Sequence, residues 1–129
     1  PLPDAATQEL AALVDRRRQL VEMLTMEHNR LAVARRSVQP SVRQTIRALD
    51  RALRALEAET DRWIQGSPLW RAQEELLTSV PGIGPQTARM LIARLTELGA
   101  LSAKEIAALV GLAPFAQESG RWRGVRRIR

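Results

Sequence analysis

The residues best suited to chemistry lie at the end of the chain, in the segment SGRWRGVRRIR (residues 119–129). A serine that attacks a phosphodiester needs positive charge beside the non-bridging oxygens and an exposed, flexible setting. Ser119 has glycines at positions 120 and 124 nearby, and the segment contains no acid. Its arginines are Arg121, Arg123, Arg126, Arg127 and Arg129. Chemistry alone leaves two interpretations open, a nucleophile beside a phosphate-binding segment or an ordinary basic tail.

The other serines have structural roles in the predicted elements. Ser37 and Ser41 fall in a turn between two long helices, and Ser79 ends a helix ahead of a proline. Ser67 and Ser102 stand where helix N-caps are expected, and serine is a favoured N-cap residue. The single histidine, His28, lies inside a predicted helix at a solvated or seam position. No group of His, Asp and Glu has metal-ligand spacing, so no metal site is predicted in this chain.

A second chemical signal is the stretch VPGIGPQTARMLI (residues 80–92), which has the pattern of a helix-hairpin-helix. Two glycines permit a tight turn, and the turn opens onto a helix N-terminus that favours a phosphate oxygen. We expect Ala88 to face inward and Arg89 to be exposed on the first turn as a side-chain accessory. The residues predicted to contact a DNA backbone here are Gly82, Ile83, Gly84, Gln86, Thr87 and Arg89. The alternative is a tight turn that only builds the core.

The elements that must position these residues all read as helices, so the fold class is all-α. Apolar spacing predicts a long helix over residues 5–36 and a second over 41–65, which carries a heptad seam. Joined by a five-residue turn, they should form an antiparallel helical hairpin, or coiled coil. Shorter helices are expected over 68–79, 85–98 and 102–110. We divide the chain into a hairpin at 1–66 and a helix-hairpin-helix domain at 67–129.

The narrow seam suggests a homo-oligomer formed through the hairpins, with packing of the hairpin on the rest of its own chain as the alternative. Arginines at 43, 47, 51 and 54 follow one flank of the second helix. Because acids are interleaved with them, a solvated face is favoured over a nucleic-acid track.

Charge and composition restrict the kind of partner. The formal net charge is +6, from 20 basic and 14 acidic residues, and arginine binds phosphate bidentately. Arginine-rich codons of a GC-rich genome could also supply this bias, so the position of the arginines matters more than their number. The sequence has no cysteine, no membrane-spanning stretch and no signal peptide, which fits a bacterial cytoplasmic protein.

Residues 76–129, with the motifs PGIGPQTA and LVGLAPFAQESGRWRGVRRIR, closely resemble the C-terminal domain of the IS-one-ten (IS116/IS902-like) insertion-sequence transposases. The family's APF…SG motif corresponds to Ala113-Pro114-Phe115 and Ser119-Gly120. The resemblance implies that Ser119 is the catalytic nucleophile of a DNA transposase, or recombinase, that forms a phosphoserine intermediate. It also implies Mg²⁺ bound by a RuvC-like domain elsewhere in the full-length protein, and a guide (bridge) RNA as partner.

No RuvC-like domain is present in these 129 residues, and the chain starts at Pro1 without an initiator Met. We therefore expect a piece of a longer transposase that carries no cofactor and is inactive alone. The alternative function is a non-catalytic helix-hairpin-helix module that binds DNA as an accessory.

Overall fold

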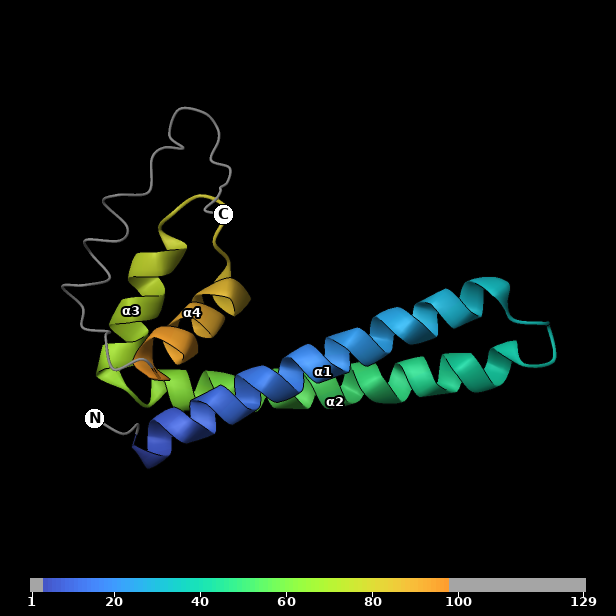
Figure 1. Cartoon of the computed structure of the whole chain (residues 1–129), viewed down its shortest axis with the longest axis horizontal. Coiled ribbons are helices and arrows are strands. Elements are labelled where there is room, and N and C mark those ends of the chain that lie inside the picture. The colour runs from blue at the N-terminus through green and yellow to red at the C-terminus, as the bar shows by residue number, and fades with distance from the viewer. Residues whose placement is uncertain (1–3, 98–129) are drawn as a thin grey trace.

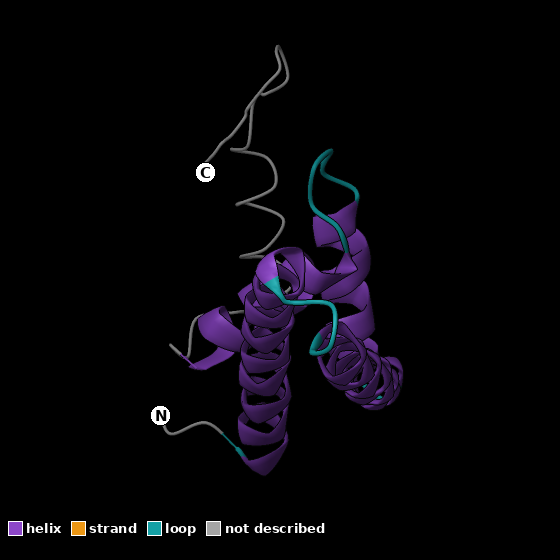
Figure 2. Ribbon diagram, turned by 90° about the vertical axis from the view of Figure 1, so that its right-hand side faces the viewer, coloured by secondary structure: helices purple, strands orange, loops and turns teal. Residues whose placement is uncertain are grey.

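The computed structural model describes residues 4–97, which form four helices and their connecting loops (Figure 1). The helices are α1 (Ala5–Val33), α2 (Gln39–Gln65), α3 (Pro68–Thr78) and α4 (Pro85–Glu97). Among the described residues no strand occurs, as Figure 2 shows, so the predicted all-α class is confirmed for this part of the chain. The predicted helix over 102–110 lies outside the described residues.

Helices α1 and α2 lie side by side and run in opposite directions over most of their length (Figure 1). Asp4 caps α1, because its side chain accepts a hydrogen bond from the Thr7 amide at 2.8 Å. That bond holds the pKa of the Asp4 carboxyl below its usual value. Between the helices, Arg17 Nε donates to Glu57 Oε2 at 2.9 Å. The hairpin is therefore joined by a cross-helix ion pair as well as by its apolar seam.

Helix α1 ends at Val33, three residues earlier than predicted, because Ala34 adopts an extended conformation. The chain then closes a turn in which the amides of Val38 and Gln39 donate to the Arg35 carbonyl. The Gln39 side chain donates to the Ala34 carbonyl at 3.2 Å. The carbonyls of Ala34 and Arg35, which lie beyond the end of α1, therefore accept hydrogen bonds within the turn. Helix α2 begins at Gln39, two residues earlier than predicted, with Pro40 in its first turn.

The seam predicted for α2 faces α1. Its seven positions are all buried or half-buried; they are Val42, Ile46, Leu49, Leu53, Leu56, Thr60 and Trp63. Toward the turn, Val42 and Ile46 of this seam form a small buried cluster with Leu24 of α1. His28, by contrast, is exposed, in agreement with one of the two positions expected for it.

Helix α3 begins at Pro68, with Ser67 as its N-cap, because Ser67 Oγ accepts a hydrogen bond from the Trp70 amide at 3.1 Å. Both assignments agree with the sequence prediction. Helices α3 and α4 then pack on each other and on the end of the hairpin where α1 begins and α2 ends, which we call the base. The opposite end, at the α1–α2 turn, is the tip.

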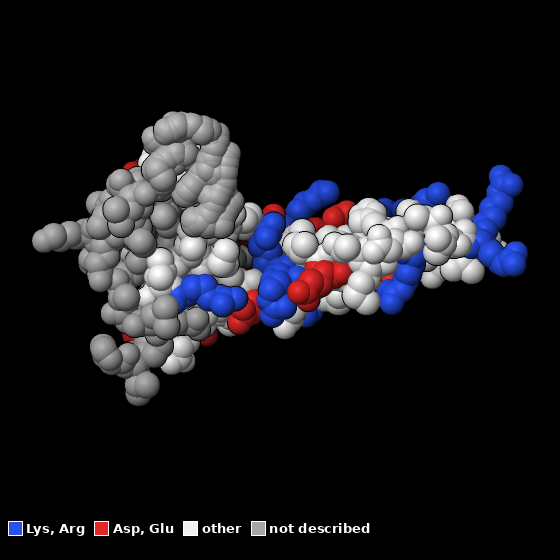
Figure 3. All heavy atoms as spheres, turned by 45° about the horizontal axis from the view of Figure 1, so that its top comes forward, with Lys and Arg blue, Asp and Glu red and all other residues white. Residues whose placement is uncertain are grey.

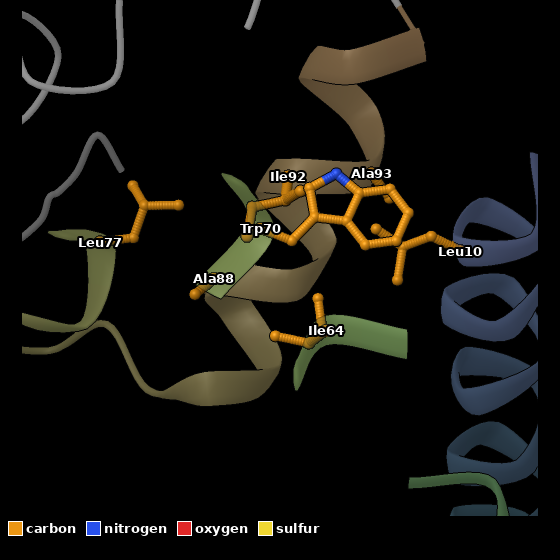
Figure 4. Close-up of a cluster of buried hydrophobic side chains, with 7 residues drawn as sticks. All are labelled: Leu10, Ile64, Trp70, Leu77, Ala88, Ile92 and Ala93. Carbon is orange, nitrogen blue, oxygen red and sulfur yellow. The ribbon is translucent and has the colours of Figure 1, made fainter. Parts of the chain in front are cut away.

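A single apolar cluster joins all four helices at the base (Figure 4). Its buried members are Leu10, Ile64, Trp70, Leu77, Ala88, Ile92 and Ala93. Because the cluster includes residues from α1 and α2 as well as α3 and α4, apolar packing crosses residue 66, where the sequence predicted a domain boundary. The base is thus where the two predicted halves of the chain share a core.

Candidate nucleic-acid interface

The turn between α3 and α4 is shaped by one glycine with a left-handed backbone. Gly82 has a φ of 91°, a conformation that residues with a side chain rarely adopt. The next residue, Ile83, donates its amide to the Val80 carbonyl at 3.1 Å and packs its half-buried side chain against the core at the base. Ile83 therefore fixes the turn to the core, while Gly82 lets the chain reverse direction.

The turn leads directly into an exposed helix N-terminus. The first intrahelical bond of α4 runs from the Ala88 amide to the Gly84 carbonyl at 3.0 Å. Among the described residues, the amides of Gln86 and Thr87 have no acceptor, as expected for the first turn of a helix. Thr87 is exposed, and a Cβ placed on the exposed Gly84 would meet no atom within 4 Å. An anion can therefore approach both the amides and the positive end of the helix dipole.

The structure corrects the expectation for Arg89. It is buried, with only 6% of its surface exposed. Arg89 Nε donates to Glu74 Oε2 at 2.6 Å and Nη2 donates to Asp61 Oδ1 at 2.8 Å. The prediction that Arg89 is exposed on the first turn is wrong, because α4 is covered by α1 on one side and by α3 on another. The two carboxylates use its charge to tie α4 to α3 and α2.

Glu74 and Asp61 are the residues that sequence reasoning missed here. The adjacent Glu74 and Glu75 lie in different environments: Glu74 is half-buried against Arg89, and Glu75 is exposed. The available signal in the sequence was the apolar Ala88, Ile92 and Ala93 around Arg89, and the structure buries all four of these positions. Such a wide stripe on a helix of 13 residues indicates two covered faces, and an arginine within it needs a carboxylate partner.

A groove of about 400 Å³ runs beside the start of α4, between that helix and α1. Thr87, Met90 and Arg94 contribute from α4, and Arg17 and Arg18 contribute from α1. Acidic residues Asp15 and Glu22 also line it. Arg18 pairs with Glu22 at 3.1 Å, whereas the exposed Arg94 forms no ion pair with the described residues and adds positive charge beside the start of α4.

The predicted nucleophile and its arginines lie outside the described residues. These are Ser119, Arg121, Arg123, Arg126, Arg127 and Arg129. Of the predicted contact residues, the described part of the chain brings together Gly82, Ile83, Gly84, Gln86 and Thr87 at one turn. Within residues 4–97 no three His, Cys, Asp or Glu side chains are grouped so as to hold a metal ion. None of the four described helices is both long and apolar enough to cross a membrane.

The described residues define an all-helical protein with an exposed glycine turn at a helix N-terminus. Comparison with known families identifies it further: residues 74–129 match the family described as Transposase IS116/IS110/IS902 family. This match covers 56 of the 129 residues and supports an IS110-like transposase, so the resemblance inferred from the motifs is confirmed for this segment. No curated protein matches the chain. The family supports a transposase-type function, and with it DNA as a partner.

Proposed function

We propose that this chain contributes DNA-backbone binding and the attacking serine to an IS110-like transposase that cleaves and exchanges DNA strands. The observation that carries the proposal is the extent of the family match, since residues 74–129 include both the glycine turn and Ser119. The two chemical signals therefore belong to the same family segment. The helix-hairpin-helix interpretation of α3, α4 and their turn is part of this proposal.

The DNA-contacting part is the turn from Gly82 to Thr87. The amides of Gln86 and Thr87, which have no acceptor among residues 4–97, and the α4 dipole attract a phosphate oxygen, and the open space at Gly84 lets the backbone of DNA approach closely. Such contacts carry no sequence information, so the turn positions DNA without selecting its sequence. In this proposal Arg89 acts on DNA only indirectly, by holding α4 against α3 through Glu74.

The chemical part is Ser119. Its hydroxyl oxygen attacks the phosphorus of a phosphodiester, a serine–phosphorus bond forms, and the bond to one DNA oxygen breaks. The serine proton is transferred to that oxygen, which leaves as a hydroxyl end. The arginines at positions 121–129 balance the negative charge that develops on the phosphoryl oxygens.

Two further elements come from the family resemblance alone. We propose that the full-length transposase binds Mg²⁺ in a RuvC-like domain and takes its target specificity from a guide RNA. We also propose that hairpins of different subunits associate as a coiled coil.

Thr87 offers a test of the DNA-binding turn that separates binding from folding. A carboxylate introduced by Thr87→Glu stands at the positive end of the α4 dipole, so it stabilises the helix by up to about 1 kcal/mol. The same charge repels phosphate, and we expect affinity for a duplex of arbitrary sequence to fall about tenfold or more at low salt. Fluorescence anisotropy measures the affinity, and thermal unfolding measures the stability.

The matched control is Thr87→Gln, which has almost the same shape as the glutamate variant and no charge. It should bind DNA within about twofold of the unchanged protein, because the backbone amides remain available. Equal affinity in the Glu and Gln variants would remove the turn from the DNA interface, whatever the role of Ser119.

Ser119→Ala tests the chemical part in a protein that carries this chain together with the metal-binding domain implied by the family. We expect strand cleavage to fall by at least about 10³-fold, because no nucleophile remains. The covalent DNA–protein product should be lost on a denaturing gel, with DNA affinity unchanged. Ser79→Ala serves as control, since this exposed serine only donates a hydrogen bond to the Leu76 carbonyl. Normal strand exchange by the Ser119→Ala variant would contradict the assignment.

A further inference from the structure

Charge is unevenly distributed along the helical hairpin. Residues 28–49, which surround the α1–α2 turn, contain five arginines and no acid. The remainder of the hairpin, residues 4–27 and 50–66, contains six arginines and nine acids. We call the first group the basic tip; it consists of Arg30, Arg35, Arg36, Arg43 and Arg47. The interleaving of acids that favoured a solvated face is therefore a property of the base and not of the tip.

The arginines of the basic tip are all exposed. Of these five arginines, only Arg30 forms an ion pair with a described residue, and its partner is Glu27 on the same helix. Arg43 Nη2 donates to the neutral Gln39 side chain at 3.3 Å. The other three have no carboxylate within the 4.0 Å that defines an ion pair in the described part of the chain. Four of the five guanidinium groups thus keep their full charge and most of their hydrogen-bond donors.

These charges converge at one end of the molecule. Arg30 comes from the last turn of α1, Arg35 and Arg36 come from the loop, and the other two come from the start of α2. Arg43 and Arg47 are four residues apart, so they lie on one face of α2 about 6 Å apart along its axis. On the face drawn in Figure 3, basic side chains stand alone at the far end of the hairpin, whereas basic and acidic side chains mix toward its middle.

Like charges brought together without acids repel one another, and this repulsion weakens when a polyanion binds. Guanidinium groups also match phosphate oxygens in geometry, through two parallel hydrogen bonds. The tip therefore has the charge and the donors of a phosphate-binding surface. Its partner is DNA, because the family match makes DNA the nucleic acid on which this protein acts.

We propose that the basic tip binds the phosphate backbone of duplex DNA, as a surface separate from the glycine turn. The glycine turn belongs to the α3–α4 pair, which packs on the base and lies away from the α1–α2 turn that forms the tip (Figure 1). The start of α4 lies beside Arg17 and Arg18, and Arg18 is separated from Val33, at the end of α1, by about 22 Å along the helix at 1.5 Å per residue. The tip thus contacts DNA that is well removed from the DNA held at the turn.

Two pairs of arginines on the same helix provide the test. R43Q/R47Q removes two positive charges from the tip, and R51Q/R54Q removes two from α2 closer to the acids of the base. All four residues are exposed and form no ion pair with the described residues, so both variants should fold normally. Circular dichroism checks their helix content. Affinity for a duplex of about 30 base pairs is then measured between about 50 and 200 mM salt, over which phosphate contacts lose most of their strength.

We expect R43Q/R47Q to weaken DNA binding about tenfold at low salt. The slope of log K against log salt should become less negative by about 2, because each arginine that no longer neutralises a phosphate changes this slope by about 1. R51Q/R54Q should change the slope by less than half as much. Equal changes in both variants would overturn the proposal, because the effect would then follow net charge and not position.

Two other outcomes would also overturn it. The first is a loss confined to a duplex RNA probe, which would make the tip an RNA-binding surface. The second is a change in molecular mass by light scattering without a change in DNA affinity. That result would mean that the tip of one hairpin contacts the acidic base of a second copy. Thr87→Glu in the same assay keeps the tests separate, since it alters the turn and leaves every tip arginine in place.

Discussion

The base and the tip of the hairpin are made from the same two helices, but they are stabilised in different ways. At the base, α3 and α4 add two more layers, and Ile64 belongs to a cluster with seven buried members from four helices. At the tip, Ile46 belongs to a cluster of three buried residues from two helices. Acids outnumber arginines at the base, whereas the tip has arginines alone. Helix α2 is therefore part of a four-helix core at one end, whereas at the other end it packs on α1 alone and carries exposed charge.

This difference places stability and binding in different parts of the molecule. Local opening requires least free energy where it exposes little apolar surface. The tip has the smaller cluster, so its helix ends open more easily than those at the base. A surface that relies on exposed charge tolerates this opening, because phosphate contacts need little shape complementarity. The base holds the residues that orient the glycine turn.

The sharpest test of this comparison uses two isoleucines of α2. Ile64 is fully buried at the base, and Ile46 is 8% exposed near the tip. We expect Ile64→Ala to lower the free energy of unfolding by about 4 kcal/mol and Ile46→Ala to lower it by about 2 kcal/mol. The larger value reflects the cavity left between four helices that cannot collapse around it. Urea unfolding followed by circular dichroism measures both changes, and equal losses would contradict the comparison.

A smaller difference is expected for two glutamates with the same exposure. The side chains of Glu74 and Glu27 are each 15% exposed and each pairs with an arginine. Their partners differ, because Arg89 is 8% exposed at its side chain and Arg30 is 58% exposed. Glu74→Gln leaves the buried Arg89 guanidinium paired only with the more exposed Asp61. We expect it to lower the free energy of unfolding by about 2–3 kcal/mol.

Glu27→Gln leaves the Arg30 side chain exposed to water, and we expect it to lower the free energy of unfolding by less than about 1 kcal/mol. Unfolding of the two variants in parallel shows whether the burial of the arginine decides the outcome. If Glu27→Gln lowers the free energy of unfolding as much as Glu74→Gln does, the ion pairs at the tip and the base stabilise the fold equally. The arginines at the tip would then serve stability and not binding.

Most of the described fold could be predicted from local sequence. Ser67 and Pro68 mark the start of α3, Pro85 follows the glycine turn, and the apolar seam of α2 identifies its inner face. These features act within one helix turn, so they can be recognised without knowing the tertiary structure. The early end of α1 was missed, because the turn at Arg35 depends on hydrogen bonds from Val38 and Gln39 that follow it.

Arg89 shows what local sequence does not contain. Its burial depends on α1, which is more than 50 residues earlier in the chain and packs on α4. The position of Asp61 and Glu74 opposite its guanidinium likewise depends on how α2, α3 and α4 come together. An arginine beside a glycine turn has the appearance of a DNA contact in sequence. Only the packing of a distant helix turns it into a buried link between helices.

The shared core at the base has a mechanical consequence. Because Leu10 and Ile64 pack in the same cluster as Trp70 and Ala88, the hairpin and the α3–α4 pair form a joint that resists bending. The part of the hairpin beyond Arg18, which lies beside the start of α4, acts as a lever arm about 22 Å long. A rotation of about 10° at the base would move its far end by about 4 Å. Small rearrangements around the glycine turn are therefore magnified at the end of the arm, and forces applied there are returned to the turn as torque.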